Sequence, residues 1–359
     1  MELLVLNTKF ETVAFIDSFE SHIWSDRYNE RGDFELTFAM DSNILEFLKE
    51  DYYLVSSESE HAMIIEDIAV DSDIEDGNML IVTGRSLESI LERRIVWGQK
   101  VLKGNLQNGV KTLINEAIIS PTDANRKIDN FIFEESTDKR ITDLTLDAQY
   151  YGEDLYSVIE GLCQEHEIGF KIVLNDNNQF VFSLYVGEDK SYRQTTNPYV
   201  VFSPEFDNII TSNYFMSKAT LKNVALVAGE GEGSSRKTAT VGSGSGLNRR
   251  EMLVEARDIS TDTDGGTLSS SEYKKQLETA GKKALSENNV TTAFEGEVET
   301  TQLFVYGEDF FIGDIVQIAD AYGHEEQVYI SEIVISQDEN GFSIRPTFKS
   351  ITETEEESK

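Results

Sequence analysis

Hydrophobic and polar positions alternate through most of the first 95 residues and predict short strands. Phe34, Leu36 and Phe38 fall on one face of such a strand, and the residues between them are polar, which is the two-residue period of a half-buried strand. Similar runs predict strands at Glu2–Leu6, Thr12–Ile16, Ser21–Arg27, Asp33–Ala39, Met63–Val70 and Met79–Thr83. The Asp-Gly pair within Glu75–Asn78 predicts a hairpin between the last two. Two short helices are predicted at 43–49 and 86–93.

The period changes to that of helices between residues 96 and 205. Apolar residues recur every three or four positions in Asn108–Ile119 and in Gly152–His166, so each segment is predicted to be an amphipathic helix. A β-hairpin is predicted after the second helix, with the strands Gly169–Leu174 and Phe180–Tyr185. This part of the chain is therefore predicted to be α+β.

The chain from residue 206 to residue 350 returns to the period of strands and contains one long helix. Tyr273, Leu277 and Ala280 mark the apolar side of that helix, which is predicted at Ser269–Glu287. Strands are predicted at Ile209–Met216, Asn223–Ala228, Lys237–Val241, Glu251–Ala256, Ala293–Glu299, Asp314–Ala319, Gln327–Ser336 and Phe342–Phe348. The predicted order is a β module, an α+β segment and a second β module, so the fold class is α+β, mainly β.

Composition narrows the classes of function. The 359 residues include 66 Asp and Glu against 31 Lys and Arg, a formal net charge of −35. A field of this sign repels phosphate, which argues against direct nucleic-acid binding and against adsorption to an anionic membrane. No run approaches the ~18 apolar residues of a membrane span, and the N-terminus does not resemble a signal peptide. We therefore expect a protein that is made in a cytoplasm and does not insert into a membrane.

The motifs that would carry catalysis or cofactor binding are incomplete. Cys163 and His166 could form a dyad or a metal pair, but core packing of the single cysteine is the simpler interpretation. The segment Asp71–Glu75 begins like a calcium-binding loop and then lacks the turn glycine. The glycine-rich segment 229–233 lacks the third glycine of a dinucleotide-binding loop. These motifs therefore single out no catalytic residue, no cofactor site and no metal site, although 66 acids leave the choice of any carboxylate pair open.

One stretch combines residues that interfaces favour with a turn between two predicted strands. Its candidate interface or structural residues are Trp24, Arg27, Tyr28, Gly32, Asp33 and Phe34. Trp, Tyr and Arg are typical anchors of protein interfaces. The same residues would also make a well-packed hairpin corner, and the sequence favours neither interpretation over the other.

A set of motifs follows in order along the chain: SHIWSDRYNERGDFELTF, MIIEDI, VTGRSLESILERRIV, YGEDFFIGDIVQI, GHEEQVYISEIVIS and GFSIRP. In order and spacing they resemble the tail-tip hub proteins of siphophages and prophages, the ReqiPepy-type siphovirus tail protein family. These proteins are similar in architecture to the baseplate hub proteins of contractile-tailed phages. The resemblance extends over roughly residues 3–350, and its motifs are structural rather than catalytic.

The resemblance implies a homotrimeric ring at the tip of a virion tail. Each subunit would carry two tube-type β-barrel domains, at residues 1–95 and 206–350, with an α+β lateral domain at 96–205 and an acidic tail at 351–359. The ring would join the sixfold tail tube to the threefold tip. The implied partners are two further copies, a distal tail or tail-tube protein, a tape-measure protein, and tip or fibre proteins. Longer relatives continue into a peptidase or a glycan hydrolase, whereas this sequence stops at Lys359, so the resemblance implies no enzyme.

Two alternatives remain open at this point. A virion protein that binds or cleaves cell-wall glycans would show an exposed aromatic groove with a carboxylate pair at its base. A spike hub of a related contractile injection system would share the architecture of the tail hub. The sequence alone does not separate the tail hub from the spike hub.

Overall fold

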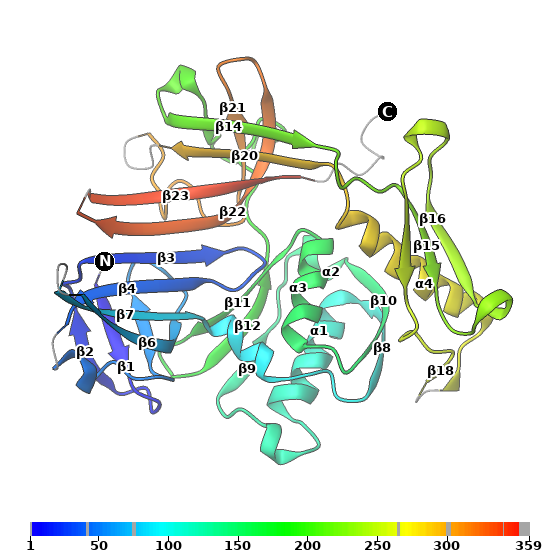
Figure 1. Ribbon diagram of the computed structural model, residues 1–359, viewed down its shortest axis with the longest axis horizontal. Coiled ribbons are helices and arrows are strands. Elements are labelled where there is room, and N and C mark those ends of the chain that lie inside the picture. The colour runs from blue at the N-terminus through cyan, green and yellow to red at the C-terminus, as the bar shows by residue number, and fades with distance from the viewer. Residues whose placement is uncertain are drawn as a thin grey trace.

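The computed structural model describes residues 2–40, 43–73, 77–263, 266–298, 303–339 and 341–351. The chain is mainly β and folds into several sheets with helices on one side of the molecule (Figure 1). The α+β, mainly β class predicted from the sequence is therefore confirmed. The expected closure of two β-barrels is not seen, since no sheet formed by the described residues closes into a barrel.

The N-terminal β module consists of strands that the alternating pattern predicts well. Its strands are β1 (Leu3–Leu6), β2 (Thr12–Ile16), β3 (Ser21–Arg27), β4 (Asp33–Ala39), β5 (Tyr53–Ser56), β6 (Met63–Asp73) and β7 (Gly77–Ser86). They lie in the order β3-β4-β7-β6-β5-β1-β2. The turn predicted at Glu75–Asn78 lies partly outside the described residues, but the strands on either side of it pair as a hairpin.

The C-terminal β module is built from long antiparallel strands. They are β14 (Ile209–Ser217), β20 (Thr291–Val298), β21 (Ile315–Ala319), β22 (Glu325–Asp338) and β23 (Gly341–Ser350), and the short β13 (Val201–Phe202) pairs with β21 in parallel. Their order is β14-β20-β23-β22, and β21 pairs with the first part of β22. The hairpin predicted at the Asn-Gly pair is confirmed by the pairing of Asp338 with Gly341.

A single 13-stranded sheet joins the two β modules, because β3 pairs with β22 in antiparallel register. The strands come from opposite ends of the sequence, and Arg27 lies opposite Glu332. One apolar core runs under this pair and includes Trp24, Leu36 and Ile333. Burial of that shared apolar surface couples the two modules.

The middle of the chain forms a separate layer with its own core. Its elements are β8 (Gln99–Asn105), α1 (Leu106–Ile114), β9 (Phe131–Glu134), α2 (Lys139–Thr142), β10 (Thr145–Tyr151), α3 (Leu155–Glu165), β11 (Gly169–Leu174) and β12 (Phe180–Tyr185). Asn105 caps α1 and Asp154 caps α3, since each side chain accepts a backbone N–H of the first turn. The two predicted helices are confirmed, and a π-helical turn, Asn115–Ile119, extends the first one.

A fourth group of elements is inserted between β14 and β20. It contains β15 (Val224–Ala228), β16 (Thr238–Gly242), β17 (Glu251–Glu255), β18 (Asp262–Thr263), β19 (Gly266–Thr267) and α4 (Ser270–Ser286). Ser269 and Glu272 form a capping box at the start of α4. One side of α4 covers the three-stranded sheet β16-β15-β17 and makes a small core around Val227 and Leu277. The sequence predicts β15, β16, β17 and α4 but not the short strands β18 and β19, and the periodicity does not reveal that these elements form a core of their own.

Short 3-10 helices complete the described chain. They are η1 (Ile44–Glu46), η2 (Leu87–Arg93), η4 (Ala124–Arg126), η5 (Pro204–Phe206), η6 (Gly233–Ser235) and η7 (Gly246–Asn248). The two short helices predicted in the N-terminal module correspond to η1 and η2.

Candidate functional site

The six residues singled out in the sequence lie together at the corner between β3 and β4. Trp24, Tyr28 and Phe34 are buried, at no more than 3% exposure each. The rings of Trp24 and Phe34 face one another across the strand pair with centroids 6.0 Å apart. The aromatic side chains therefore belong to the interior of this chain.

Arg27 connects the two β modules beside this aromatic group. Its Nε donates to Glu332 Oε1 on β22 at 2.8 Å, and its Nη1 donates to Asp33 Oδ2 at 2.6 Å and to the Arg31 carbonyl at 2.9 Å. Burial works against the charge, but Asp33 and Glu332 raise the pKa of Arg27. The guanidinium thus stays charged and fixes the corner to the opposite end of the sequence.

Tyr28 lies where three parts of the chain meet. Its backbone N–H donates to the Ser331 carbonyl on β22 at 2.9 Å, and its hydroxyl donates to the Glu167 carbonyl before β11 at 3.3 Å. A Cβ on Gly169 or Gly313 would lie 2.5 Å or 2.4 Å from the Tyr28 ring, so both positions require glycine for this approach. Burial raises the pKa of the Tyr28 hydroxyl, which keeps it a neutral donor.

Gly32 allows the turn after β3 to lie directly against that strand. A Cβ at this position would lie 2.3 Å from the Ser25 carbonyl oxygen. The Gly32 N–H also donates to Ser86 Oγ at 2.7 Å, which ties the turn to the end of β7. The six predicted residues therefore form one packed corner whose contacts join distant parts of the same chain.

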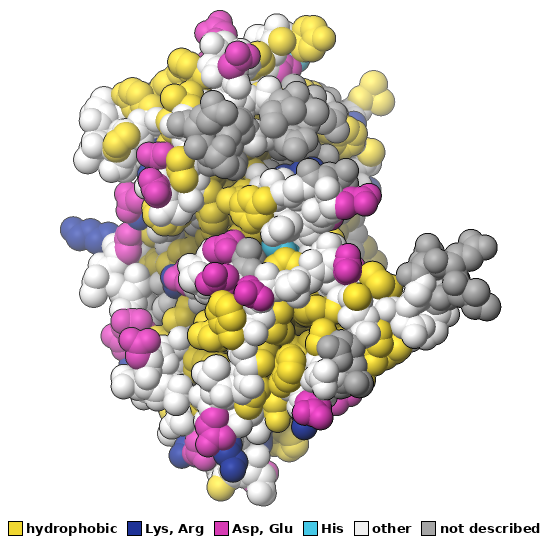
Figure 2. Space-filling model, turned by 90° about the vertical axis from the view of Figure 1, so that its left-hand side faces the viewer, with side chains coloured by type: hydrophobic (Ala, Val, Ile, Leu, Met, Phe, Trp, Pro, Cys, Tyr) yellow, Lys and Arg dark blue, Asp and Glu magenta, His cyan; other side chains and the backbone are white. Residues whose placement is uncertain are grey.

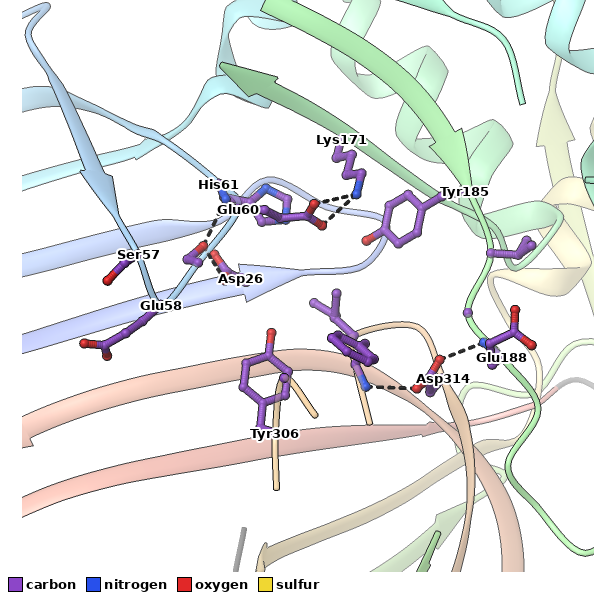
Figure 3. Close-up of a pocket in the computed structure, with 16 residues that line it drawn as sticks. Asp26, Ser57, Glu58, Glu60, His61, Lys171, Tyr185, Glu188, Tyr306 and Asp314 are labelled. Atoms are coloured by element: carbon purple, nitrogen blue, oxygen red, sulfur yellow. Dashed lines mark hydrogen bonds and ion pairs between the residues drawn. The ribbon is translucent and has the colours of Figure 1, made fainter. Parts of the chain in front are cut away.

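A cavity of about 580 Å³ opens beside this corner, between β3, the segment before β6, the β11–β12 hairpin and the segment before β21 (Figure 3). Carboxylates and tyrosine rings share its wall, which includes Asp26, Glu60, His61, Lys171, Tyr185 and Tyr306. The Lys171 ammonium closes one side, at 2.7 Å from both Glu60 carboxylate oxygens and 4.9 Å from the Tyr185 ring centroid. Most of the charge that faces the cavity is thus already paired.

A buried charged network supports the wall of the cavity. His61 Nδ1 lies 3.2 Å from Glu88 Oε1, which also accepts the Ile172 N–H at 2.7 Å. Asp26 accepts the Ser59 hydroxyl at 2.7 Å. Burial alone would lower the pKa of His61, but Glu88 and Asp26 raise it to about 9. The imidazole is therefore charged at neutral pH and forms a buried ion pair with Glu88.

The pKa values of the two acids in this network shift in opposite directions. Burial raises the pKa of Asp26. For Glu88 burial acts in the same direction, but the neighbouring His61 and hydrogen bonds outweigh it and lower the pKa of Glu88. Sequence reasoning missed this network, although one signal was present: Asp26 follows Trp24 by two residues and so shares the inward face of β3.

The segment after β12 is held to the C-terminal module by one buried carboxylate. Asp314 Oδ1 accepts the Glu188 N–H at 2.7 Å, and its Oδ2 lies 2.8 Å from Lys190 Nζ. Oδ2 also accepts the Phe311 N–H at 2.9 Å. Asp314 thus fixes the connection between the middle layer and β21.

The chemistry available at this junction is that of packing and charge pairing. A serine nucleophile needs a hydrogen bond from its hydroxyl to a base such as histidine. Here the Ser59 hydroxyl donates to Asp26, and the His61 ring lies against Glu88. Ser59 and His61 therefore do not form a nucleophile and base. Burial raises the pKa of the Cys163 thiol and disfavours the thiolate. Within the described ranges no group of three or more His, Cys, Asp or Glu is placed to hold a metal ion.

The fold is similar to that of solved tail proteins from phages and prophages. The tail protein from Neisseria meningitidis MC58 is 12% identical, with 97% of this chain and 96% of that chain covered and a TM-score of 0.59. The 43 kDa tail protein of prophage MuSo2 from Shewanella oneidensis is 11% identical, with 98% of each chain covered and a TM-score of 0.60. The chain also resembles a protein of the Francisella PdpA–VgrG complex, with 9% identity and a TM-score of 0.50. This match covers 97% of this chain and 57% of that chain.

Fold and comparisons together define the class as that of phage tail proteins with similarity to tail hubs. The chain belongs to the Siphovirus ReqiPepy6 Gp37-like protein family, whose family model matches residues 2–348. The family resemblance found in the sequence is thereby confirmed. Comparison with curated proteins gives no match. In the part of the chain that the structure describes, no helix combines the length and the apolar character needed to cross a membrane.

Proposed function

We propose that this protein is the hub of a phage or prophage tail tip, and that three copies form a ring joining the sixfold tail tube to the threefold tip. Membership of a siphovirus tail protein family supports a place in the virion tail. In this proposal residues 1–95 and 206–350 act as two tube-type barrel modules, with residues 96–205 as a lateral domain. Three subunits supply six similar modules, which matches the symmetry of a sixfold tube.

The observation that carries this proposal is a continuous sheet with two open ends. Within the described chain, β2 pairs only with β1 and β14 pairs only with β20 (Figure 1). Open edges are templates for pairing with another strand. Both edge strands expose large apolar side chains, with Phe15 at 54% on β2 and Phe215 at 52% on β14. A head-to-tail contact of β2 with β14 of the next subunit would close into a ring.

The pairing of β3 with β22 provides an internal template for such a contact. There an edge of the N-terminal module already meets an edge of the C-terminal module within one chain. In a ring of three, these intrachain junctions would alternate with the interchain ones. Figure 2 shows hydrophobic side chains gathered in two areas of one side of the molecule, with acidic side chains between and around them. Apolar areas of this kind support contact between subunits that each carry a net charge of −35.

The open face of the N-terminal sheet is where we place the lumen of the ring. A shallow groove on this face is lined by Asp33, Glu35, Asp67 and the Glu66–Arg85 ion pair. Acids outnumber bases there. A negative wall does not bind passing DNA. The ends of the ring would then contact the distal tail or tail-tube protein, the tape-measure protein, and tip or fibre proteins.

The test is a mass measurement by light scattering, together with end-on electron micrographs. We expect about three times 40.5 kDa and a ring in the images. Phe15→Asp should give monomers, because it replaces an apolar side chain with a charge on the edge strand that the contact would cover. Leu247→Asp is the matched control, since Leu247 is fully exposed on η7, outside the proposed contact. A wild-type protein that stays monomeric at high concentration, with no ring in assembled tails, would contradict the proposal.

A spike hub of a contractile injection system is the second candidate, favoured by the similarity to the VgrG complex. Both candidates predict a trimer. Neighbouring genes for a tape-measure protein and tail fibres would support the phage tail, and genes for a sheath and effectors would support the injection system.

A further inference from the structure

A groove on the middle layer, called the Trp97 groove below, contains the exposed one of the chain's two tryptophans. Trp97 is 68% exposed, whereas Trp24 is fully buried. The groove has a volume of about 570 Å³ and lies between the segment that joins η2 to β8, the end of α1 and the loop that carries η4. In Figure 1 both α1 and β8 lie well below β14. None of the lining residues belongs to β2 or β14, the strands proposed to join the ring.

The Trp97 ring is held in place by the chain around it. The N–H of the buried Val96 donates to the Glu153 carbonyl at 2.9 Å, which fixes the backbone next to the ring. The Arg126 guanidinium carbon lies 5.1 Å from the Trp97 ring centroid, a distance at which the cation is attracted to the ring. Arg126 Nη2 in turn donates to the Ile95 carbonyl at 2.9 Å. An exposed ring that is already ordered loses little conformational freedom when a ligand packs against it.

The charged side chains that line the groove balance one another. They are two cations and two carboxylates: Lys100, Arg126, Glu116 and Asp123. Lys100 Nζ lies 2.5 Å from Glu116 Oε2. Asp123 Oδ1 accepts the backbone N–H and a side-chain N–H of Asn125, at 3.0 Å and 2.9 Å. An ion of either sign would therefore bring an unbalanced charge into the groove, whereas a neutral ligand with donors and acceptors would not.

We propose that the Trp97 groove binds a neutral saccharide. A pyranose ring has an apolar C–H face and a rim of hydroxyl groups. The Trp97 ring provides a surface for the apolar face, and the two carboxylates and two cations provide acceptors and donors for the hydroxyl groups. The volume of the groove lies within the usual range of small-ligand sites, so it suits a short oligosaccharide. An exposed aromatic side chain beside a carboxylate pair is also the arrangement expected above of a virion protein that binds cell-wall glycans.

Charge argues against the other ligands that an exposed tryptophan could bind. An acidic peptide, a nucleic acid or an anionic wall polymer would be repelled by the net charge of −35 and would gain nothing from a groove whose own charges cancel. A basic segment would be attracted by the chain as a whole, but by no excess of acids in this groove. A neutral saccharide meets neither objection.

The two carboxylates support binding rather than cleavage of the saccharide. A glycosidase needs one of its two acids to give up a proton to the leaving group. Glu116 and Asp123 instead both accept donors from this chain, Lys100 and Asn125 respectively. Further acceptor positions on these carboxylates can serve sugar hydroxyl groups. The groove is therefore assigned a binding role.

Saccharide binding adds to the hub proposed above and does not depend on it. The groove is formed within one subunit, and a monomer would present it as a ring would. The two proposals therefore fail separately.

The experiment screens the full-length protein on an array of uncharged oligosaccharides that includes N-acetylchitohexaose, cellohexaose and maltohexaose, and then titrates the strongest binder. Tryptophan fluorescence reports on the groove, because Trp97 is exposed and Trp24 is buried. We expect the bound sugar to shift the emission to shorter wavelength and to protect it from quenching by acrylamide. Calorimetry gives the affinity of variants that lack the Trp97 signal.

Two substitutions in the groove should weaken binding, and two outside it should not. Trp97→Ala should weaken it at least about tenfold, and the exposed ring can be removed without opening the core. Asp123→Asn should weaken it about fivefold through the loss of a charged acceptor, while asparagine still caps η4. The matched controls are Tyr322→Ala, at an 89% exposed aromatic residue elsewhere, and Asp129→Asn, at an 84% exposed side chain in the same loop. Both should stay within about twofold of wild type.

Three results would overturn the proposal: no uncharged oligosaccharide bound, unchanged affinity of Trp97→Ala, or polygalacturonate bound as tightly as the neutral sugar. The last result would show that the site does not select for a neutral ligand. Light scattering on the same samples keeps the ring separate. A wild-type monomer that binds the sugar would contradict only the ring, and a trimer that binds none would contradict only the saccharide site.

Discussion

The contact of β3 with β22 and the contact of α4 with β10 both join parts of the chain that lie far apart in sequence, but they are built differently. The first combines backbone pairing with a shared apolar core and the buried ring of Tyr28. The second is mainly polar: Gln149 donates to Gln276 and to the Ser260 carbonyl, and Lys275 pairs with Asp147. A cavity of about 700 Å³ remains beside this second contact.

This difference predicts which parts of the chain unfold together. Apolar burial is the main stabilising contribution to folding, so the β3–β22 junction makes the two β modules one cooperative unit. Polar contacts exchange hydrogen bonds to water for bonds within the protein and add little net free energy. The elements from β15 to α4 form a small core of their own and are called the α4 group below. This group should therefore open independently of the large sheet.

The largest expected effect comes from removing the Tyr28 side chain from the β3–β22 junction. Tyr28→Ala should lower the free energy of unfolding by about 3–5 kcal/mol, because it leaves a cavity against Gly169 and Gly313. Equilibrium unfolding in urea measures this change. Tyr322→Ala, at an exposed site, should stay within about 0.5 kcal/mol of wild type. A loss below about 1 kcal/mol for Tyr28→Ala would mean that the modules are not coupled through this corner.

The buried ion pair beside the junction should come next in size. Glu88→Gln leaves the charged His61 without its carboxylate and should cost about 3 kcal/mol of unfolding free energy. The same urea titration measures it. Glu278→Gln is the matched control, because Glu278 forms an exposed helical ion pair with Lys274, which is worth about 0.3–0.5 kcal/mol. Equal effects of the two substitutions would show that burial of the His61–Glu88 pair does not matter for stability.

The pH dependence of stability sharpens the same comparison. His61 has a pKa of about 9 in the folded chain, above its ordinary value of 6.5. Its contribution is therefore fully present below pH 6.5 and is lost as the pH rises through 9. Burial raises the pKa of the nearby Asp26, so ionisation of its carboxylate with rising pH changes stability in the same direction.

We accordingly expect the unfolding midpoint in urea to fall between pH 6.5 and pH 9.5. In His61→Gln this fall should be much smaller. The α4 group, monitored by amide exchange corrected for the intrinsic pH effect, should show no comparable change. A fall of equal size in wild type and His61→Gln would assign the pH dependence to other groups.

The sequence predicted most local structure but not the way in which the modules are joined. The strands Ser21–Arg27 and Asp33–Ala39 were predicted with their observed bounds, and in Asp33–Ala39 buried and exposed positions alternate clearly. The short strands β5 and β9 were missed, and so were the seven-residue strands β8 and β10, in which buried and exposed positions do not alternate regularly. Pairing of β3 with β22 links residues about 300 positions apart, and no local pattern encodes such a pairing.

The candidate site was predicted in part for the same reason. The aromatic and arginine residues around Trp24 stand out by composition. The roles of Gly169 and Gly313 depend on where Tyr28 lies in space, and the His61–Glu88 pair joins residues 27 positions apart. In both cases the burial of a side chain is decided by tertiary contacts, which composition does not report.

The smallest expected effect concerns the contact between α4 and β10. Gln276 is buried and accepts a hydrogen bond from Gln149, so Gln276→Ala should loosen this contact. The free energy of global unfolding should change by about 1 kcal/mol or less. Hydrogen exchange measured by mass spectrometry should instead show faster exchange in α4 and in β15–β17, with β3 and β22 unchanged.

Lys274→Ala serves as the control on the same helix, because Lys274 is exposed and pairs only with Glu278 among the described residues. It should leave exchange in α4 close to that of wild type. If Gln276→Ala sped up exchange in β3 and β22 as much as in α4, the polar contact would transmit stability as the apolar junction does. The distinction between the two contacts would then fail, because a few hydrogen bonds would couple modules as strongly as a shared core.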